Sequence, residues 1–291
     1  RIAITNVFAR VSPLDKLRLV SAFEKRHAIV AMTGDGINDS AALQQAHIGI
    51  SVGSGHDIAK ESSDLVLLDG NFASIVDAIS GGRRIYDNIR KVLMFLLYGS
   101  LTEVLIIVVA LALGFPLPLL PAQILWVNII TDTFPAMAFI FEPGEPETMS
   151  EKPRSPKESL FNRMAWEMLI VGGTVNATLL LSLFWWYAVH LQNLALGRSV
   201  VFVGLGAFVI GISLALKSFR RSIVRTNIFS NIPLLISLVG VIALYGVAFY
   251  VPLISSLLHT VLLPMHALGA VFSLVIVNIF VVELIELRHR K

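Results

Sequence analysis

Two acidic side chains stand inside long apolar stretches of the sequence. Glu103 is the only charged residue in the segment 92–115, and Asp132 is the only one in 119–141. Ionisable residues inside membrane spans are costly and usually face a polar interior or an ion pathway. Carboxylate oxygens are also suitable ligands for hard cations. The two acids therefore predict a buried cation site, with hydrogen bonding between helices through a protonated acid as the alternative.

Further oxygen ligands occur at helical spacing beside these acids. Ser100 lies three residues before the first acid, which places both on one helix face. Asn128, Thr131 and Asp132 fall at positions i, i+3 and i+4, and should again share a face. Pro135 leaves a backbone carbonyl free one turn earlier, which predicts either another ligand or a break in the helix.

A glycine-rich polar loop, TGDGIND, occupies Thr33–Asp39 after a short apolar segment. Gly34 and the second glycine allow the backbone to turn tightly and to approach a ligand. Asp35 and Asp39 offer hard oxygen ligands that suit Mg²⁺. The alternative is a surface turn, because Gly, Asp and Asn also favour turns for local reasons.

Other polar groups near this loop suit a phosphate group. Thr33 offers a hydroxyl, and the Asn38 amide can donate to a phosphate oxygen. A helix begins directly after the loop, and its N-terminus favours an anion. Lys16 can add a positive charge. Together these groups would suit Mg²⁺ and a phosphate group, with the surface turn as the alternative.

The elements around this loop read as part of an α/β domain with a parallel sheet, because strands and helices alternate. Ligands of such sheets bind beyond the carboxyl ends of the strands, which is where the loop lies. Ser12-Pro13-Leu14-Asp15 has the form of a capped helix start. The expected strands are Asn6–Arg10, Ala28–Met32, Ile48–Ser51 and Leu65–Leu68, and the expected helices are Ser12–Arg26 and Ser40–Gln45.

The rest of the chain predicts a membrane domain. The chain is 55% hydrophobic and 15% charged with a mean hydropathy of +0.76, which excludes a disordered protein and disfavours a water-soluble monomer. We expect a cytoplasmic domain with its stalk over 1–91 and an all-α bundle over 92–291. Six stretches approach the length of about 20 residues that a spanning helix needs: 92–115, 119–141, 166–189, 200–216, 232–251 and 268–285.

Charges in the connecting segments orient these spans. Fifteen Lys and Arg residues lie in 82–91, 142–165, 217–231 and 286–291, whereas the opposite loops hold only Arg198. The positive-inside rule then places both termini in the cytoplasm. The protein is expected to be a multi-pass integral protein of the lipid bilayer, in the plasma membrane (the inner membrane of a bacterium).

Composition excludes several classes of function. There are no cysteines, so no disulfide, thiolate metal site or cysteine nucleophile exists. The net charge is only +3, from 23 basic and 20 acidic residues, which argues against a nucleic-acid partner. The basic loops of the membrane domain account for the pI of 9.3.

Several motifs resemble those of P-type cation-transporting ATPases. TGDGIND at Thr33–Asp39 is similar to their hinge motif, and VFARVSP at Val7–Pro13 matches its flank. WVNIITD at Trp126–Asp132 resembles the sixth membrane helix of the type II, calcium-pump-like branch. PRSPKE at Pro153–Glu158 resembles the loop that follows. The resemblance covers nearly the whole chain and is most specific before Phe161.

The resemblance implies a HAD-like phosphorylation domain, of which 1–91 would carry the C-terminal part. Asp35 would then hold the catalytic Mg²⁺ with support from Asp39, Asn38 would contact the phosphoryl group, and Lys16 would offset its charge. The family's phosphorylated aspartate lies in an Asp-Lys-Thr-Gly-Thr motif, which does not occur here. The ATP-binding domain would belong to a missing N-terminal part of the same pump, so this chain alone is expected to be inactive.

The resemblance also implies a transported cation, with Ca²⁺ expected and Na⁺, Mn²⁺ or H⁺ as alternatives. Glu103, Asn128, Thr131 and Asp132 match ligand positions of the calcium-pump pattern. Ser100 stands where calcium pumps have asparagine. The fourth span lacks the acid that completes one calcium site, which favours a single site here.

A competing hypothesis is a short, non-catalytic membrane protein that binds cations or assembles with a separate ATPase chain. The absence of the phosphorylation motif favours it. The retained loop at Thr33–Asp39 disfavours it, because a simple cation binder has no use for paired aspartates at a phosphate-type turn.

Overall fold

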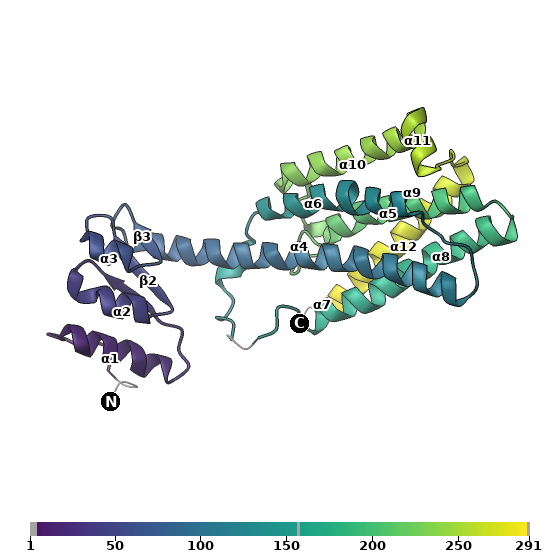
Figure 1. Ribbon diagram of the computed structural model, residues 1–291. Coiled ribbons are helices and arrows are strands. Elements are labelled where there is room, and N and C mark those ends of the chain that lie inside the picture. The colour runs from purple at the N-terminus through teal and green to yellow at the C-terminus, as the bar shows by residue number, and fades with distance from the viewer. Residues whose placement is uncertain (1–4, 156–157, 290–291) are drawn as a thin grey trace. The chain divides into compact units, whose positions relative to one another are not determined.

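The computed structural model describes residues 5–155 and 158–289. The chain divides into two compact units, residues 1–81 and residues 82–291. Each unit has its own packing and is described separately below (Figure 1).

The first unit contains a three-stranded parallel sheet in the order β1-β2-β3. Its helices are α1 (Pro13–Glu24), α2 (Ser40–Gln45) and α3 (Asp57–Glu61), and its strands are β1 (Ala31–Gly34), β2 (Ile48–Val52) and β3 (Leu65–Leu67). Ala31 pairs with Ile48 across the first two strands. A small buried cluster contains Val20 of α1, Ala42 of α2 and Ala46, which directly follows α2. The alternation of strands and helices thus confirms the predicted parallel sheet.

Several local predictions for this unit can be compared with the structure. The capping box is confirmed: the Ser12 hydroxyl accepts from the Asp15 amide at 3.3 Å, and the Asp15 carboxylate accepts from the Ser12 amide at 3.3 Å. The predicted strand Asn6–Arg10 is wrong, since it has no strand partner and Arg10 has a φ of 54°. Strand β1 begins three residues later than predicted because its partner β2 begins at Ile48.

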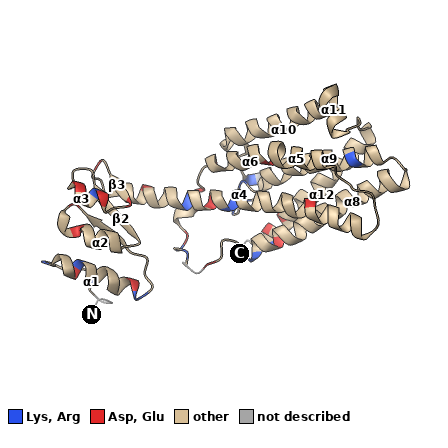
Figure 2. Ribbon diagram, viewed as in Figure 1, with Lys and Arg blue, Asp and Glu red and all other residues tan. Residues whose placement is uncertain are grey.

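The second unit is a helical bundle with six helices long and apolar enough to cross a membrane, by length and composition. Figure 2 shows that most of their length carries no charge. The six run over Ala73–Ala112, Pro121–Phe141, Arg163–His190, Leu194–Ala215, Ile232–Tyr250 and Met265–His289, and the start of the first, up to Gly81, belongs to the first unit. The first begins well before position 92, because helix α4 (Ala73–Ala112) continues through the polar segment that precedes the apolar run.

Two of these spans are composites of α-helix and π-helix. The second consists of α5 (Pro121–Trp126), a π-helical segment (Val127–Asp132), α6 (Thr133–Ala138) and a 3₁₀ turn (Phe139–Phe141). The third consists of α7 (Arg163–Glu167), α8 (Gly173–Phe184) and the π-helical segments Met168–Gly172 and Trp185–His190. The remaining helices are α9 (Leu194–Ala215), α10 (Ile232–Tyr250), α11 (Pro252–Leu258) and α12 (Met265–His289), with short 3₁₀ turns at Pro146–Met149, Ile223–Arg225 and Ile228–Ser230.

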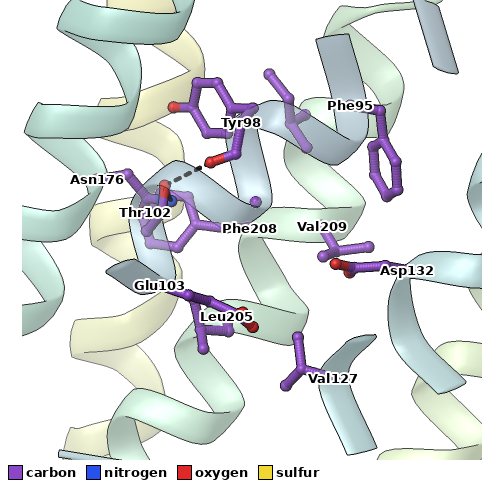
Figure 3. A pocket seen from close by; sticks show the side chains of 12 residues that line it. Phe95, Tyr98, Thr102, Glu103, Val127, Asp132, Asn176, Leu205, Phe208 and Val209 are labelled. Carbon is purple, nitrogen blue, oxygen red and sulfur yellow. Dashed lines mark hydrogen bonds between the residues drawn. The ribbon is translucent and has the colours of Figure 1, made fainter. Parts of the chain in front are cut away.

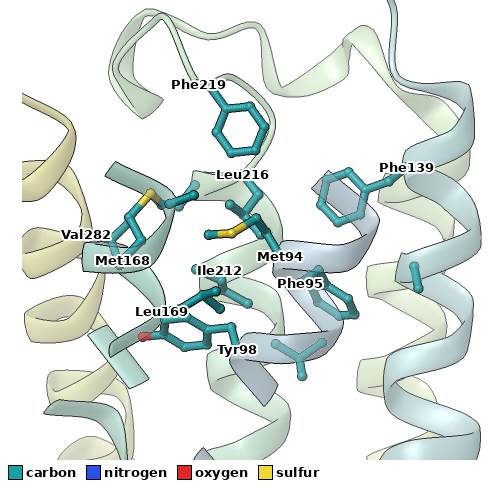
Figure 4. Close-up of a cluster of buried hydrophobic side chains, with 14 of the residues drawn as sticks. Met94, Phe95, Tyr98, Phe139, Met168, Leu169, Ile212, Leu216, Phe219 and Val282 are labelled. Carbon is teal, nitrogen blue, oxygen red and sulfur yellow. The ribbon is translucent and has the colours of Figure 1, made fainter. Parts of the chain in front are cut away.

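Helix α9 is the central helix of the bundle. In its most apolar stretch 67% of the residues are buried inside the protein, a larger share than in any of the other five spans described. Ile212 of α9 and Leu216, which follows it, belong to a core in which Phe95 of α4 packs against Phe139 with ring centroids 5.7 Å apart (Figure 4). A second apolar cluster surrounds Phe202 further along the bundle. The polar cavity described next lies between residues of these two clusters.

Candidate cation and phosphate sites

Glu103 and Asp132 line one small cavity inside the second unit (Figure 3). Glu103 lies in the last third of α4, and Asp132 ends the π-helical segment of the second span. Both are buried, with 7% and 4% of their surfaces exposed. The helix order thus brings together two carboxylates that lie 29 positions apart in the sequence.

One oxygen of each carboxylate has no hydrogen-bond partner among the described residues: Oε1 of Glu103 and Oδ1 of Asp132. The other oxygen of Glu103 accepts a hydrogen bond from Nδ2 of Asn128 at 3.1 Å. A buried polar atom without a partner costs free energy, and a buried charge costs more unless it is paired. The site is therefore short of positive charge or of donors, which a cation or protons would supply.

The π-helical segment decides which side chains of the second span reach the cavity. In an α-helix, residues five apart point about 140° away from each other. The i→i+5 bonding of a π-helix brings them nearer to one face instead, and both Val127 and Asp132 line the cavity. The Thr133 hydroxyl donates to the Asn128 carbonyl at 3.2 Å. Pro135 has no backbone N–H and cannot donate to the carbonyl four residues earlier, which is consistent with a break in the α-helical pattern here.

Three of the five predicted cation ligands, Ser100, Asn128 and Thr131, do not line the cavity. Ser100 is exposed on α4. Around the helix axis, at 100° per residue, Gly99 and Thr102 lie on one side of Glu103 and line the cavity, whereas Ser100 lies on the other side. Thr131 is buried and its hydroxyl has no hydrogen-bond partner among the described residues, yet it is not part of the lining. Asn128 is itself exposed and reaches the site through its bond to Glu103.

The structure adds two oxygen groups that the sequence analysis did not assign to the site. Thr102 and Asn176 both line the cavity and are both fully buried. The Thr102 hydroxyl donates to the Tyr98 carbonyl at 2.9 Å and lies 3.4 Å from the Asn176 amide nitrogen. Oδ1 of Asn176 has no hydrogen-bond partner among the described residues. The polarity of Asn176 within an apolar span was the one sequence signal that could have found it.

The cavity has a volume of about 20 Å³. A site needs about 10–15 Å³ on this scale to hold one water molecule. Its size therefore suits a single ion or water, and its lining offers carboxylate, amide and hydroxyl oxygens. That donor set is typical of hard cations and lacks the sulfur and imidazole ligands that softer metals prefer.

In the first unit, Asp39 is the buried residue of the loop Thr33–Asp39. Its carboxylate forms an ion pair with Lys16 of α1. Gly34 is required at its position, since a Cβ there would lie 2.5 Å from Cβ of Asp39 and 3.0 Å from its Oδ2. The loop backbone thus closes directly over Asp39, at the carboxyl end of β1.

The other polar side chains of this loop are open to solvent. Asp35, Asn38 and Thr33 are all exposed. The segment 53–56 packs against the backbone of Asp35, whose carbonyl accepts from the His56 amide at 2.8 Å. Nowhere in the described part of the chain do three His, Asp or Glu side chains gather closely enough to hold a metal ion. Two carboxylates still suit Mg²⁺, which usually keeps several waters and takes phosphate oxygens as further ligands.

Comparison with known proteins gives consistent matches. The family described as "Cation transporting ATPase, C-terminus" matches residues 116–288, more than half of the chain. The "Calcium-transporting ATPase" of Bacillus subtilis (strain 168) is 42% identical over 257 residues, which are 88% of this chain and 29% of that protein. "Calcium-transporting ATPase 1" of Bacillus cereus (strain ATCC 10987 / NRS 248) is 38% identical over 98% of this chain and 34% of its own length.

A third relative agrees with these two. "Calcium-transporting ATPase 1" of Lactococcus lactis subsp. lactis (strain IL1403) is 37% identical over 83% of this chain and 27% of its own length. The chain thus spans about a third or less of the relatives that it matches. The family match over residues 116–288 and these relatives agree, so the chain belongs to the P-type cation-transporting ATPases and corresponds to their C-terminal portion.

Proposed function

We propose that this chain works as the C-terminal portion of an ATP-driven pump that moves Ca²⁺ across a membrane. The observation that carries the proposal is the pair of unpartnered carboxylate oxygens, Oε1 of Glu103 and Oδ1 of Asp132, on one buried cavity. Two carboxylates in such surroundings repel each other unless positive charge lies between them. A divalent cation would neutralise both at once. The names of the relatives favour Ca²⁺ among the hard cations.

The proposed ion would bind to Glu103 and Asp132, with Asn128, Thr102 and Asn176 completing the polar surroundings. Ca²⁺ takes six to eight oxygen ligands in flexible geometry, and waters regularly supply some of them. The volume of about 20 Å³ leaves room for one ion. We therefore propose a single site in this bundle.

The loop Thr33–Asp39 would serve the phosphoryl-transfer half of the cycle. Asp35 and Asp39 would hold Mg²⁺, which neutralises phosphate charge, and the exposed amide of Asn38 can donate to a phosphate oxygen. Lys16 keeps Asp39 in place through their ion pair. The phosphorylated aspartate and the ATP-binding domain are assigned to the part of the relatives that this chain does not cover. The first unit would then be part of a HAD-like domain.

Helix α4 gives the two halves a physical connection. It runs without interruption from Ala73 to Ala112 and carries Glu103. We propose that movement of the phosphorylation domain reaches the cation site through this helix. Four glycines inserted after Tyr86, in the protein at its native length, should lower the number of ions moved per ATP. Four alanines at the same place preserve helix and should lower it less; equal coupling in both variants would exclude this route.

The membrane orientation follows from the charges of the loops. Fifteen basic residues lie on the side where both termini emerge, against Arg198 alone on the other. We propose that this side is cytoplasmic and that the protein resides in the plasma membrane. Cysteines introduced singly into 190–199 and 217–231 should react with an impermeant reagent from opposite sides of sealed vesicles.

The site is tested by Glu103→Gln and Asp132→Asn in the protein at its native length. Each variant should abolish Ca²⁺-stimulated phosphorylation by ATP and Ca²⁺ binding at equilibrium. Glu167→Gln is the matched control. It also removes a carboxylate from a span, but Glu167 pairs with His289 and does not line the cavity. The transported ion is identified by measuring phosphorylation by ATP while the concentration of Ca²⁺, Mn²⁺, Na⁺ or H⁺ is varied. Unchanged cation dependence in both site variants would refute the assignment.

A further inference from the structure

A second cavity in the bundle unit is an open cleft of about 530 Å³. It lies among the basic segments that follow the second and fourth spans, and it is bounded by α4, the start of α7 and the end of α12. Its volume is within the range of about 300–1,000 Å³ that is usual for small-molecule sites. The cleft is separate from the cation cavity, with which it shares no lining residue.

Positive charge dominates the lining of this cleft. Its permanently charged cations are Arg90, Lys152, Arg154, Arg163 and Arg220. Two carboxylates, Glu151 and Glu158, line it as well. The lining therefore carries an excess of positive charge.

Two acids at the cleft, Asp87 and Glu151, are already engaged by two of these arginines. Nη2 of Arg154 lies 3.0 Å from one oxygen of Asp87, and Nη2 of Arg220 lies 2.9 Å from the other. Arg220 also donates from Nε and Nη2 to both oxygens of Glu151, at 2.6 and 2.9 Å. These bonds hold the two arginines in fixed positions, and a third cation, Arg163, lies 3.5 Å from Oε1 of Glu167.

Arg90 is a buried cation of this cleft with only a distant carboxylate partner among the described residues. It is only 6% exposed, and its Nε has no hydrogen-bond partner among the described residues. Its nearest carboxylate, Asp87, is 3.9 Å away and shared with two other arginines. The guanidinium also stacks over Phe219, 5.0 Å from the ring centroid. A buried guanidinium with a free donor, on the lining of a cleft rich in positive charge, points to an anionic ligand.

We propose that this cleft binds a phosphate group, presented either by the headgroup of an anionic phospholipid or by free phosphate. Guanidinium forks match the geometry of phosphate oxygens, and Lys152 and Arg163 would add charge at the rim. The cleft lies at the level where α7 begins, and the exposed Trp166 one turn into that helix marks a membrane interface. Basic clusters at such interfaces attract anionic lipids. This proposal does not depend on the identity of the transported ion.

The test uses the protein at its native length, purified in detergent, with two probes. Native mass spectrometry measures retained phosphatidylglycerol against phosphatidylcholine, and calorimetric titration measures binding of inorganic phosphate. Lys152→Gln/Arg163→Gln removes two exposed cations from the rim, and Arg90→Gln removes the buried one. The matched control is Arg221→Gln/Arg225→Gln, which removes two exposed cations of a neighbouring loop that do not line the cleft.

We expect each cleft variant to weaken binding by about tenfold or more, since hydrogen bonds to charged groups contribute about 1.5–3 kcal/mol. The control should bind like the unmodified protein. If the cleft variants lose only the retention of phosphatidylglycerol, the ligand is a lipid headgroup. If they lose only the binding of inorganic phosphate, the ligand is the free anion. If neither probe binds, or if the cleft variants bind as the control does, the proposal is wrong. Should Arg90→Gln unfold, the rim variant decides alone.

Discussion

The amide of Asn128 donates a hydrogen bond to Oε2 of Glu103 across two helices, over 3.1 Å. The same amide group also donates to the Ile124 carbonyl at 3.0 Å. An exposed residue of the π-helical segment thereby fixes one oxygen of a buried acid. The other oxygen of Glu103 stays free to face the cavity.

Asn128→Ala should therefore weaken cation binding without abolishing it. Loss of a hydrogen bond to a charged group costs about 1.5–3 kcal/mol, equivalent to roughly a tenfold rise or more in the cation concentration at half-maximal phosphorylation. The protein at its native length is titrated with Ca²⁺ to measure this. Ser100→Ala should have no effect, because Ser100 is exposed and does not line the cavity. An equal shift in both variants would contradict this description of the site.

Gly172→Ala should destabilise the bundle. A Cβ at this position would lie 2.9 Å from Cε2 of Tyr98 and 3.1 Å from its hydroxyl, which donates to Asn278 at 2.9 Å. Overpacking of this kind costs about 1–3 kcal/mol. Thermal unfolding in detergent gives the measurement. Gly240→Ala is the control, because a Cβ there meets no atom within 4 Å, and it should be neutral or slightly stabilising.

The buried ion pair between Lys217 and Glu142 makes a different prediction. Nζ of Lys217 lies 2.9 Å from Oε1 of Glu142, whose other oxygen accepts from Asn231 at 2.7 Å. Lys217→Met alone leaves a buried carboxylate without its counter-charge and should cost about 3–5 kcal/mol. Lys217→Met/Glu142→Gln removes both charges but keeps an acceptor for Asn231, and it should recover most of that loss. A double variant as unstable as the single one would show that the charges are not coupled.

Low pH should reduce the stability contributed by the loop that follows the second span. The two hydrogen bonds from Arg220 hold the pKa of Glu151 below its ordinary value of 4.5. The carboxylate binds protons less readily in the folded protein, so its contribution to stability is present above pH 4.5 and declines as pH falls through the lowered pKa. Melting temperature measured against pH should fall less steeply for Glu151→Gln. Parallel curves would mean that other groups cause the acid sensitivity.

The sequence by itself determined the classes of structure and chemistry in this protein. Apolar runs of membrane length usually form spanning helices, so all six spans could be located, although the first helix begins at Ala73 and not at position 92. Glu103 and Asp132 stood out because charge inside such runs is costly. The capping box at Ser12 could be predicted because it involves only neighbouring residues. The strand expected at Asn6–Arg10 failed because a strand requires a partner, which local sequence does not reveal.

Only the tertiary structure decided which side chains share the cation cavity. Thr102 and Asn176 lie on different helices, and their meeting depends on how α4 and α8 pack. The spacing of Asn128, Thr131 and Asp132 assumed α-helical geometry, whereas the π-helical segment rotates these residues relative to one another. Ser100 does not line the cavity for a similar reason, because the packing of α4 turns a different face of the helix towards its neighbours. Residue types are read from the chain, but their orientation is set by packing between segments that are distant in sequence.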